Sequence, residues 1–196
     1  MHTTRTEAVS FSSLLGEIAV SLNQIACSNY VIAVERAANL LASAFQTGHK
    51  LLVFGNGGSS ADAQHICGEL VGRFLKTRRG LPALALTANQ AVLTAWANDC
   101  AYDDIFARQI QAHGNPKDVA WGISTSGNSA NVVAGLQAAR DRGLHTIALT
   151  GEGGGRVAEW ADILLAVPLQ ETPRIQEVHL ITYHSICAAV EQMLFP

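Results

Sequence analysis

The amino-acid sequence predicts an α/β fold built on a parallel sheet of five strands with helices on both faces. Short apolar runs end in Gly, Ser, Thr or Pro, and most are followed by a stretch with helical periodicity. The runs are nearly continuously apolar rather than alternating, as expected for strands that are covered on both faces. They are LLVFG (51–55), LPALALT (81–87), DVAWGIST (118–125), HTIALTG (145–151) and DILLAVP (162–168).

Helical segments are predicted on either side of the strand-forming region. Residues 7–47 form a long helical region in which VIAVERAANLLASAF (31–45) repeats apolar residues at helical spacing. Pro173 suits the first turn of a carboxy-terminal helix. With no internal repeat and no linker, we expect one domain over residues 1–196, with a helical region at 1–47 and an α/β core with its last helix at 48–196. Helices outside a five-stranded sheet favour a homo-oligomer.

Composition limits the classes of function. A chain of 196 residues with 48% hydrophobic and 15% charged residues is typical of a soluble globular protein. The net charge is −3 and the one basic cluster, KTRRG (76–80), is predicted to be a solvated loop, so we expect no nucleic-acid or membrane partner. Four scattered cysteines without a CxxC pair indicate reduced thiols, and no apolar run approaches the roughly 20 residues of a membrane span. We therefore expect a cytoplasmic protein.

The loop GNGGSS (55–60) follows the first strand, at the end of the sheet where such folds bind ligands. It matches GxGxxG only in part, because Ser60 replaces the third glycine, and the second strand ends without the carboxylate that would hold a ribose. No lysine follows the glycines, so a P-loop is excluded as well. Ser59 and Asp62 predict a capped helix start whose N–H groups approach an oxyanion. A tight turn without a ligand is the alternative.

The loop STSGNSAN (124–131) follows the third strand and strengthens the case for an anion. Ser124, Thr125, Ser126 and Ser129 surround Gly127 at the start of a predicted helix. Hydroxyl groups and free amides at a helix start suit a phosphate monoester without a fixed cation. Such a loop alone is often only a capped turn, but two at the same end of one sheet favour a sugar phosphate. The glycine-rich turn GEGGG (151–155) is expected to be flexible and to make no phosphate contact.

Polar residues near these loops suggest a metal site. His65 and Glu69 are four residues apart and lie on one helix face, although such a pair is often an exposed pair without function. On the last helix Gln176 and His184 diverge by only about 80°, whereas His179 points elsewhere and is expected to pack or to contact another subunit. Two imidazoles, a carboxylate and an amide oxygen suit zinc if the two helices meet.

Five motifs together resemble the phosphoheptose isomerases, which are sugar-isomerase (SIS) domain enzymes. They are GNGGSSADAQHICGEL, ANDCAYDDIF, GISTSGNSANVV, LTGEGGG and TPRIQEVHLITYH, and the resemblance extends from about residue 50 to the end of the chain. It implies a flavodoxin-like sheet, a homotetramer with active sites at subunit contacts, and one zinc per subunit. Cys100 stands where the family commonly has an aromatic residue, which removes no catalytic group.

The resemblance also implies roles for individual residues. The implied metal ligands are His65, Glu69, Gln176 and His184. The implied substrate contacts are Asn56, Gly57, Gly58, Ser59, Glu69, Asn98, Asp99, Ser124, Thr125, Ser126, Ser129 and Gln176.

The implied reaction converts sedoheptulose 7-phosphate into D-glycero-D-manno-heptose 7-phosphate through an enediol, the first step of nucleotide-activated heptose biosynthesis, which serves lipopolysaccharide among other products. Glu69 is the expected base and His184 the expected acid. The alternative is a non-catalytic SIS-domain regulator that binds the bacterial replication initiator protein. Those regulators lack the glutamate and the histidine, whereas this chain has both.

Overall fold

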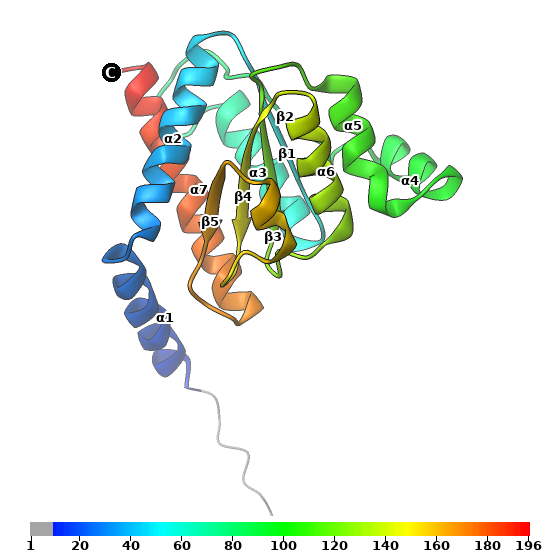
Figure 1. The fold of residues 1–196 in the computed structure, drawn as a ribbon. Coiled ribbons are helices and arrows are strands. Elements are labelled where there is room, and N and C mark those ends of the chain that lie inside the picture. The colour runs from blue at the N-terminus through cyan, green and yellow to red at the C-terminus, as the bar shows by residue number, and fades with distance from the viewer. Residues whose placement is uncertain (1–9) are drawn as a thin grey trace, which may run out of the picture.

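The structure, a computed structural model, describes residues 10–196 and contains the predicted five-stranded parallel sheet (Figure 1). Residues 7–9 of the predicted helical region lie outside the described part. The strand order is β2-β1-β3-β4-β5, the flavodoxin-like order, so the α/β fold class is confirmed. The strands are β1 (Leu51–Gly55), β2 (Ala83–Ala85), β3 (Val119–Ser124), β4 (His145–Thr150) and β5 (Ile163–Ala166).

The edge strand β2 is shorter than the run LPALALT (81–87) predicted. It pairs only with β1, through Leu51 with Ala83 to Val53 with Ala85. Pro82 has no N–H to donate, and only its carbonyl joins the pairing, by accepting from the Leu51 N–H at 2.9 Å. Sequence periodicity therefore marked the strand but not its ends.

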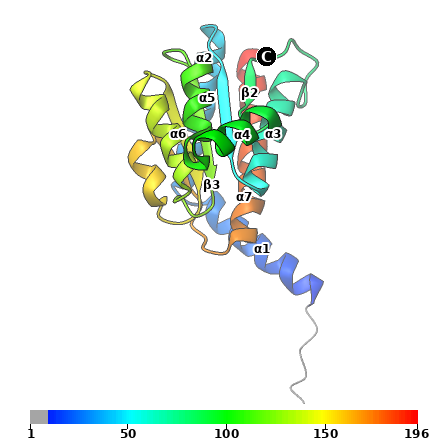
Figure 2. The ribbon, with the colours of Figure 1, turned by 90° about the vertical axis from the view of Figure 1, so that its right-hand side faces the viewer.

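Helices form a layer on each face of the sheet (Figure 2). One layer contains α2 (Tyr30–Gln46), α3 (Gly58–Val71) and α7 (Thr172–Leu194). The other contains α5 (Ile105–His113) and α6 (Ala130–Asp141). Along β1, Leu51 and Val53 pack into the first layer while Leu52 and Phe54 pack into the second. Burial on both faces explains why the strand sequences are continuously apolar.

Four shorter or peripheral elements complete the fold. They are α1 (Phe11–Ala26), α4 (Gln90–Asp99) and the 3-10 helices η1 (Tyr102–Asp104) and η2 (Gly155–Trp160). The predicted amino-terminal helical region is thus two helices, and α1 buries only Ile25 while Phe11 is 75% exposed. Among the described residues, no helix has the length and apolarity needed to cross a membrane.

The helix after β1 begins earlier than the capping pattern at Ser59 predicted. Gly57 precedes α3 with a φ of 55°, and its position receives no side-chain cap. A positive φ is accessible to glycine at little cost, so the chain turns directly from β1 into the helix. The capping prediction was therefore wrong, because Ser59 already lies in the first turn of α3 and is buried.

Candidate active site

The two candidate ligand-binding loops lie at the carboxyl ends of β1 and β3. These strands are neighbours, and the strand order changes direction between them. The chain leaves β1 toward β2 on one side and leaves β3 toward β4 on the other. Open α/β sheets form a crevice at this position. Both loops that the sequence singled out, 55–60 and 124–131, begin at the ends of these two strands.

An amide pair bridges the two strand ends. The Asn56 Nδ2 group donates to Asn131 Oδ1 at 2.8 Å, and the Asn131 Nδ2 group donates to Asn56 Oδ1 at 2.9 Å. The Tyr102 hydroxyl also donates to Asn56 Oδ1, at 3.0 Å. A hollow of about 100 Å³ lies beside Asn56 and Gly57. Asn56 is among the residues predicted from the sequence, whereas Asn131 and Tyr102 are not, because nothing in the local sequence shows which distant side chains contact Asn56.

The serine-rich loop presents hydroxyl groups at the start of α6. Ser124 Oγ and Ser129 Oγ lie 3.1 Å apart, and Ser124 is buried. Ser129 precedes the helix but makes no side-chain capping bond, so its hydroxyl is not committed to the helix end. The unpaired N–H groups and the dipole of a helix start favour an anion. Thr125 is half-buried and Ser126 is exposed in the same loop.

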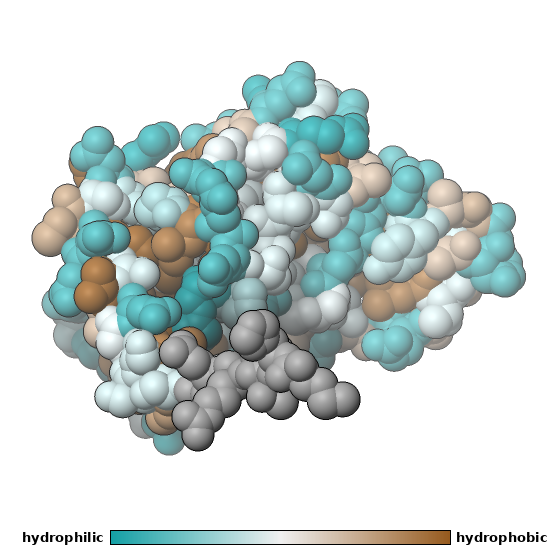
Figure 3. Space-filling model, turned by 90° about the horizontal axis from the view of Figure 1, so that it is seen from below, coloured by the Kyte–Doolittle hydropathy of each residue, from teal (hydrophilic) through white to brown (hydrophobic). Residues whose placement is uncertain are grey.

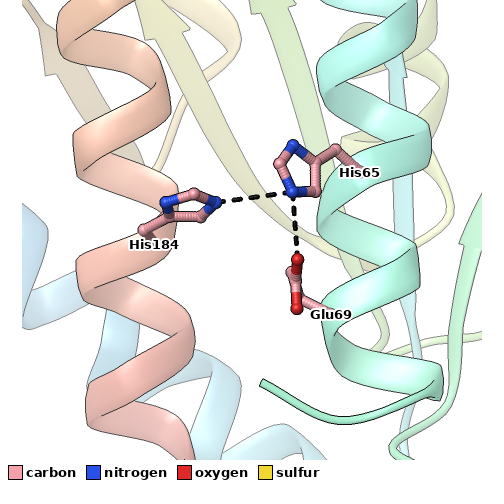
Figure 4. Close-up of side chains that lie close together, drawn as sticks. All are labelled: His65, Glu69 and His184. Atoms are coloured by element: carbon pink, nitrogen blue, oxygen red, sulfur yellow. Dashed lines mark hydrogen bonds and ion pairs between the residues drawn. The ribbon is translucent and has the colours of Figure 1, made fainter. Parts of the chain in front are cut away.

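His65, Glu69 and His184 converge from two helices (Figure 4). His65 Nε2 lies 3.0 Å from Glu69 Oε1 on α3 and 3.5 Å from His184 Nε2 on α7. One ligand atom from each of the three residues lies within 4.8 Å of the others. Ligands around a tetrahedral zinc at 2.0–2.1 Å are about 3.3 Å apart, so this spacing fits a metal ion.

Hydrogen bonds behind His65 strengthen that fit. The Tyr183 hydroxyl donates to Asp62 Oδ1 at 3.4 Å and lies 2.9 Å from His65 Nδ1. With the phenol proton directed to Asp62, the hydrogen-bond pattern assigns the imidazole proton to Nδ1. The Nε2 lone pair then faces the Glu69 carboxylate, an arrangement that a cation stabilises.

Burial perturbs both groups behind the cluster. It raises the pKa of the Asp62 carboxyl, against the opposing effects of the Tyr183 hydrogen bond and the nearby His65. It also raises the pKa of Tyr183, and Asp62 adds to that rise. Sequence analysis considered Asp62 only as a helix cap and did not select Tyr183, although it adjoins His184.

Gln176 lies at the glycine turn. A Cβ placed on Gly58 would be 2.8 Å from Gln176 Nε2, so the two predicted site residues are in contact. On α7 the backbone of Gln176 is about two helical turns from that of His184. Ser59 is only 5% exposed, and a Cβ on Gly55 would lie 2.8 Å from its Cβ.

Asn98 and Asp99 are not brought to the cluster within this chain. Both are exposed at the end of α4, where the Asn98 Nδ2 group donates to Asp99 Oδ1 at 2.8 Å. Figure 1 shows α4 and α7 on opposite sides of the molecule. Their contact with substrate stays a prediction.

A buried ion pair anchors the cluster from behind. The Arg78 Nε group donates to Glu191 Oε1 at 2.8 Å, and both side chains are almost fully buried. Arg78 also donates to the carbonyl of Glu69 at 2.7 Å. The Glu191 carboxylate accepts from the N–H of Phe74, whose ring lies 5.3 Å from that of His184. The solvated loop expected for KTRRG is thus wrong for Arg78, which ties α3 to α7.

His179 packs as the sequence predicted. It is fully buried, and its Nε2 lies 3.1 Å from the Thr150 carbonyl oxygen. Burial lowers the pKa of His179 to about 4, although the hydrogen bond to Thr150 opposes the shift. A neutral, buried imidazole outside the cluster has a structural role.

Comparison with known proteins is consistent with this geometry. The SIS domain family matches residues 17–151. A phosphoheptose isomerase of Synechocystis sp. is 53% identical over 167 residues, which cover 85% of this chain and 86% of the relative. The structure of a phosphoheptose isomerase from Neisseria gonorrhoeae superposes with a TM-score of 0.87 at 39% identity, and that of one from Francisella tularensis with 0.88 at 35%. Each comparison covers 92% of this chain and 96% of the solved one.

Proposed function

The chain belongs to the phosphoheptose isomerase family of SIS domain proteins, and from this premise we propose that it interconverts sedoheptulose 7-phosphate and D-glycero-D-manno-heptose 7-phosphate. The chain is accordingly an aldose–ketose isomerase of heptose biosynthesis. The observation that carries the proposal is the convergence of His65, Glu69 and His184 from α3 and α7, in a chain whose two candidate anion-binding loops follow β1 and β3. The cluster supplies the acid and the base, and the two loops supply the anion-binding groups.

The isomerisation requires two proton movements. A base removes a proton from C1 of the ketose and returns it to C2, while the hydroxyl proton on O1 is transferred to O2, so that an enediol is formed and consumed. We assign the carbon-bound proton to Glu69, which is partly exposed at 22%, and the oxygen-bound proton to His184. Both groups point toward the same space (Figure 4).

The cluster is also the proposed metal site, with His65, Glu69, Gln176 and His184 as ligands and zinc as the ion. When bound, zinc would polarise the carbonyl and stabilise negative charge on the substrate oxygens. Among the chain's own groups, Tyr183 holds His65 with its Nε2 toward the cluster. Gln176, which lies against the Gly58 position at the glycine turn, is the proposed fourth ligand.

The phosphate end of the substrate is assigned to the serine-rich loop. The hydroxyl groups of Ser124, Thr125, Ser126 and Ser129 and the first N–H groups of α6 supply donors to it. Asn56, Gly57 and Gly58 are assigned to substrate contacts in the same crevice, and Ser59 to the phosphate.

We further propose that residues 1–196 form one SIS domain that assembles as a homotetramer. Figure 3 shows hydrophobic side chains exposed on the side of the molecule where the amino-terminal helices lie. An apolar hollow of about 410 Å³ opens between α1, α2 and α7, where Val31 and Ile181 line it. A second copy would cover this surface and offers a route by which Asn98 and Asp99 reach a site. Four free cysteines, two of them buried, support a cytoplasmic location.

The experiment that tests the function measures conversion of sedoheptulose 7-phosphate by the purified protein. The protein is assayed after removal of metal and again after zinc is restored, together with His184→Ala. His145→Ala is the matched control, since His145 is exposed at the amino end of β4. We expect zinc-dependent turnover that is lost in His184→Ala and kept in His145→Ala. Folded, zinc-loaded protein without turnover would overturn the proposal and favour the initiator-binding regulator.

A further inference from the structure

The glycine-rich turn after β4 packs directly on the serine-rich loop. We call residues 124–129 the phosphate loop and residues 151–155 the glycine segment. The Gly151 N–H donates to the Thr125 carbonyl at 2.9 Å, and just beyond the segment the Val157 N–H donates to the Gly127 carbonyl at 2.9 Å. The glycine segment is therefore not the free, flexible turn that the sequence suggested.

The two stretches approach too closely for side chains between them. A Cβ on Gly127 would lie 2.0 Å from the Gly154 carbonyl oxygen, and a Cβ on Gly155 would lie 2.7 Å from that of Ser126. Real Cβ atoms do not approach backbone atoms this closely, so any side chain here would displace the phosphate loop. Gly153 differs, because its φ of 76° is equally left-handed but nothing lies within 4 Å of its Cβ position.

The packing also decides which backbone groups of the phosphate loop remain available. Carbonyl oxygens repel an anion, and all four from residues 124–127 accept hydrogen bonds. The Ser124 carbonyl accepts from the Gly127 N–H and the Thr125 carbonyl from the Gly151 N–H, each at 2.9 Å. The Ser126 carbonyl accepts from Asn128 Nδ2 at 2.8 Å, and the Gly127 carbonyl accepts from the Val157 N–H at 2.9 Å. Two of these four come from beyond β4. The loop can then direct its hydroxyl and amide donors toward a ligand.

Asn128 joins the two stretches through its side chain. Its Nδ2 group donates to the Ser126 carbonyl, while its Oδ1 accepts from the Arg156 N–H at 3.1 Å. One amide thus orients a carbonyl of the phosphate loop and holds the chain that follows the glycine segment.

We propose that Gly155 is the positioning residue of the phosphate site, because its missing side chain lets the phosphate loop lie where it does, whereas Gly153 makes no contact with that loop. This inference rests on the proposed function, which assigns the substrate's phosphate to that loop. Gly155 acts through the loop, so its substitution should affect phosphate binding and KM and leave the His65, Glu69 and His184 cluster unchanged.

The test compares Gly155→Ala with Gly153→Ala in the zinc-loaded protein. Both variants introduce a methyl group at a left-handed glycine, but only the first meets the phosphate loop. The measurements are the Kd of inorganic phosphate by calorimetry, KM and kcat for the sugar phosphate, and zinc affinity by competition with a chelator. For Gly155→Ala we expect phosphate binding weakened by about tenfold or more, a matching rise in KM, and unchanged zinc affinity.

Gly153→Ala should bind phosphate as the unaltered protein does. Asn128→Ala adds no atoms and removes the side-chain link, so it tests the inference if Gly155→Ala does not fold, and it too should weaken phosphate binding. If folded Gly155→Ala and Asn128→Ala bind phosphate as tightly as the unaltered protein, the inference is overturned and the proposed function is not. An unaltered protein that neither binds phosphate nor turns over would overturn the proposed function and this inference together.

Discussion

Replacement of Glu191 by Gln should destabilise the protein strongly, because it breaks a buried charge network at several points. Oε1 of Glu191 accepts from Arg78 Nε at 2.8 Å and the Phe74 N–H at 2.9 Å, while Oε2 accepts from the Leu75 and Lys76 N–H groups at 2.7 and 2.9 Å. Whichever oxygen becomes an NH2 group, two donors then face a donor.

The size of the effect follows from burial. The Arg78 side chain is 1% exposed, so its charge would lose its partner without gaining water. Removing one partner of a buried pair costs about 3–5 kcal/mol. Burial by itself raises the pKa of Glu191, but the backbone N–H groups of residues 74–76 and Arg78 hold it below the usual range. The native state therefore stabilises the charge that the substitution removes.

A matched control lies on the same helix. Arg174 and Glu177 also form an Arg–Glu pair at 2.8 Å, but their side chains are 26% and 38% exposed. Glu177→Gln should cost less than about 1 kcal/mol, because water screens an exposed pair and hydrates its members. The assay is urea unfolding followed by circular dichroism at one fixed protomer concentration, since an oligomer's stability depends on concentration.

Equal losses in Glu191→Gln and Glu177→Gln would refute the reasoning. The double variant Arg78→Met/Glu191→Leu removes both charges but leaves the Phe74, Leu75 and Lys76 N–H groups without their acceptor, so it should not regain the stability of the unaltered protein. Because Arg78 also donates to the Glu69 carbonyl, this double variant should still bind zinc more weakly than the unaltered protein.

Three other substitutions or reactions give direct tests. Burial lowers the pKa of His179 from 6.5 to about 4, so as the pH falls the unfolded chain binds a proton at this residue before the folded protein does. The free energy of unfolding should therefore fall between pH 6.5 and pH 4. His179→Gln should flatten that part of the pH profile, as measured by urea unfolding. Tyr183→Phe keeps the ring but removes the partner of His65 Nδ1 at 2.9 Å, so zinc affinity measured with a competing chelator should fall by about tenfold or more, and an unchanged affinity would contradict the assigned tautomer. Burial raises the pKa of the Cys67 and Cys187 thiols to about 12, so a thiol reagent at neutral pH should modify the two exposed cysteines of the folded protein and spare these two until it unfolds.

Local patterns predicted the five strands and the last helix. The run LLVFG coincides with β1, and Pro173 lies in the first turn of α7 as its fixed φ favours. The ends of elements were less predictable, because they depend on neighbours in space. β2 is cut short as an edge strand after Pro82, and α3 starts at Gly58 because Gly57 reverses the chain without a cap.

Long-range contacts explain what the sequence could not show. The spacing of His65 and Glu69 placed them on one helix face, but only the packing of α3 against α7 brings His184 to within 3.5 Å of His65. Arg78 belongs to a polar pentapeptide that reads as a solvated loop, and its partner Glu191 lies 113 residues away. A buried ion pair leaves no local signature, because each member alone resembles an exposed charge.

The cluster of His65, Glu69 and His184 is open to solvent on one side and held by protein contacts on the other. On its open side, the His65 side chain is 42% exposed and that of Glu69 is 22% exposed, so a metal ion or a substrate can reach the ligand atoms. On its inner side, Tyr183 contacts His65, and Arg78 bonds to the backbone of Glu69. These inner contacts are partly buried. Because these contacts already hold the His65 side chain and the Glu69 backbone in place, the two residues lose little conformational entropy when a ligand binds. This is the physical advantage of joining α3 to α7 through a buried ion pair, although burying the two charges costs free energy.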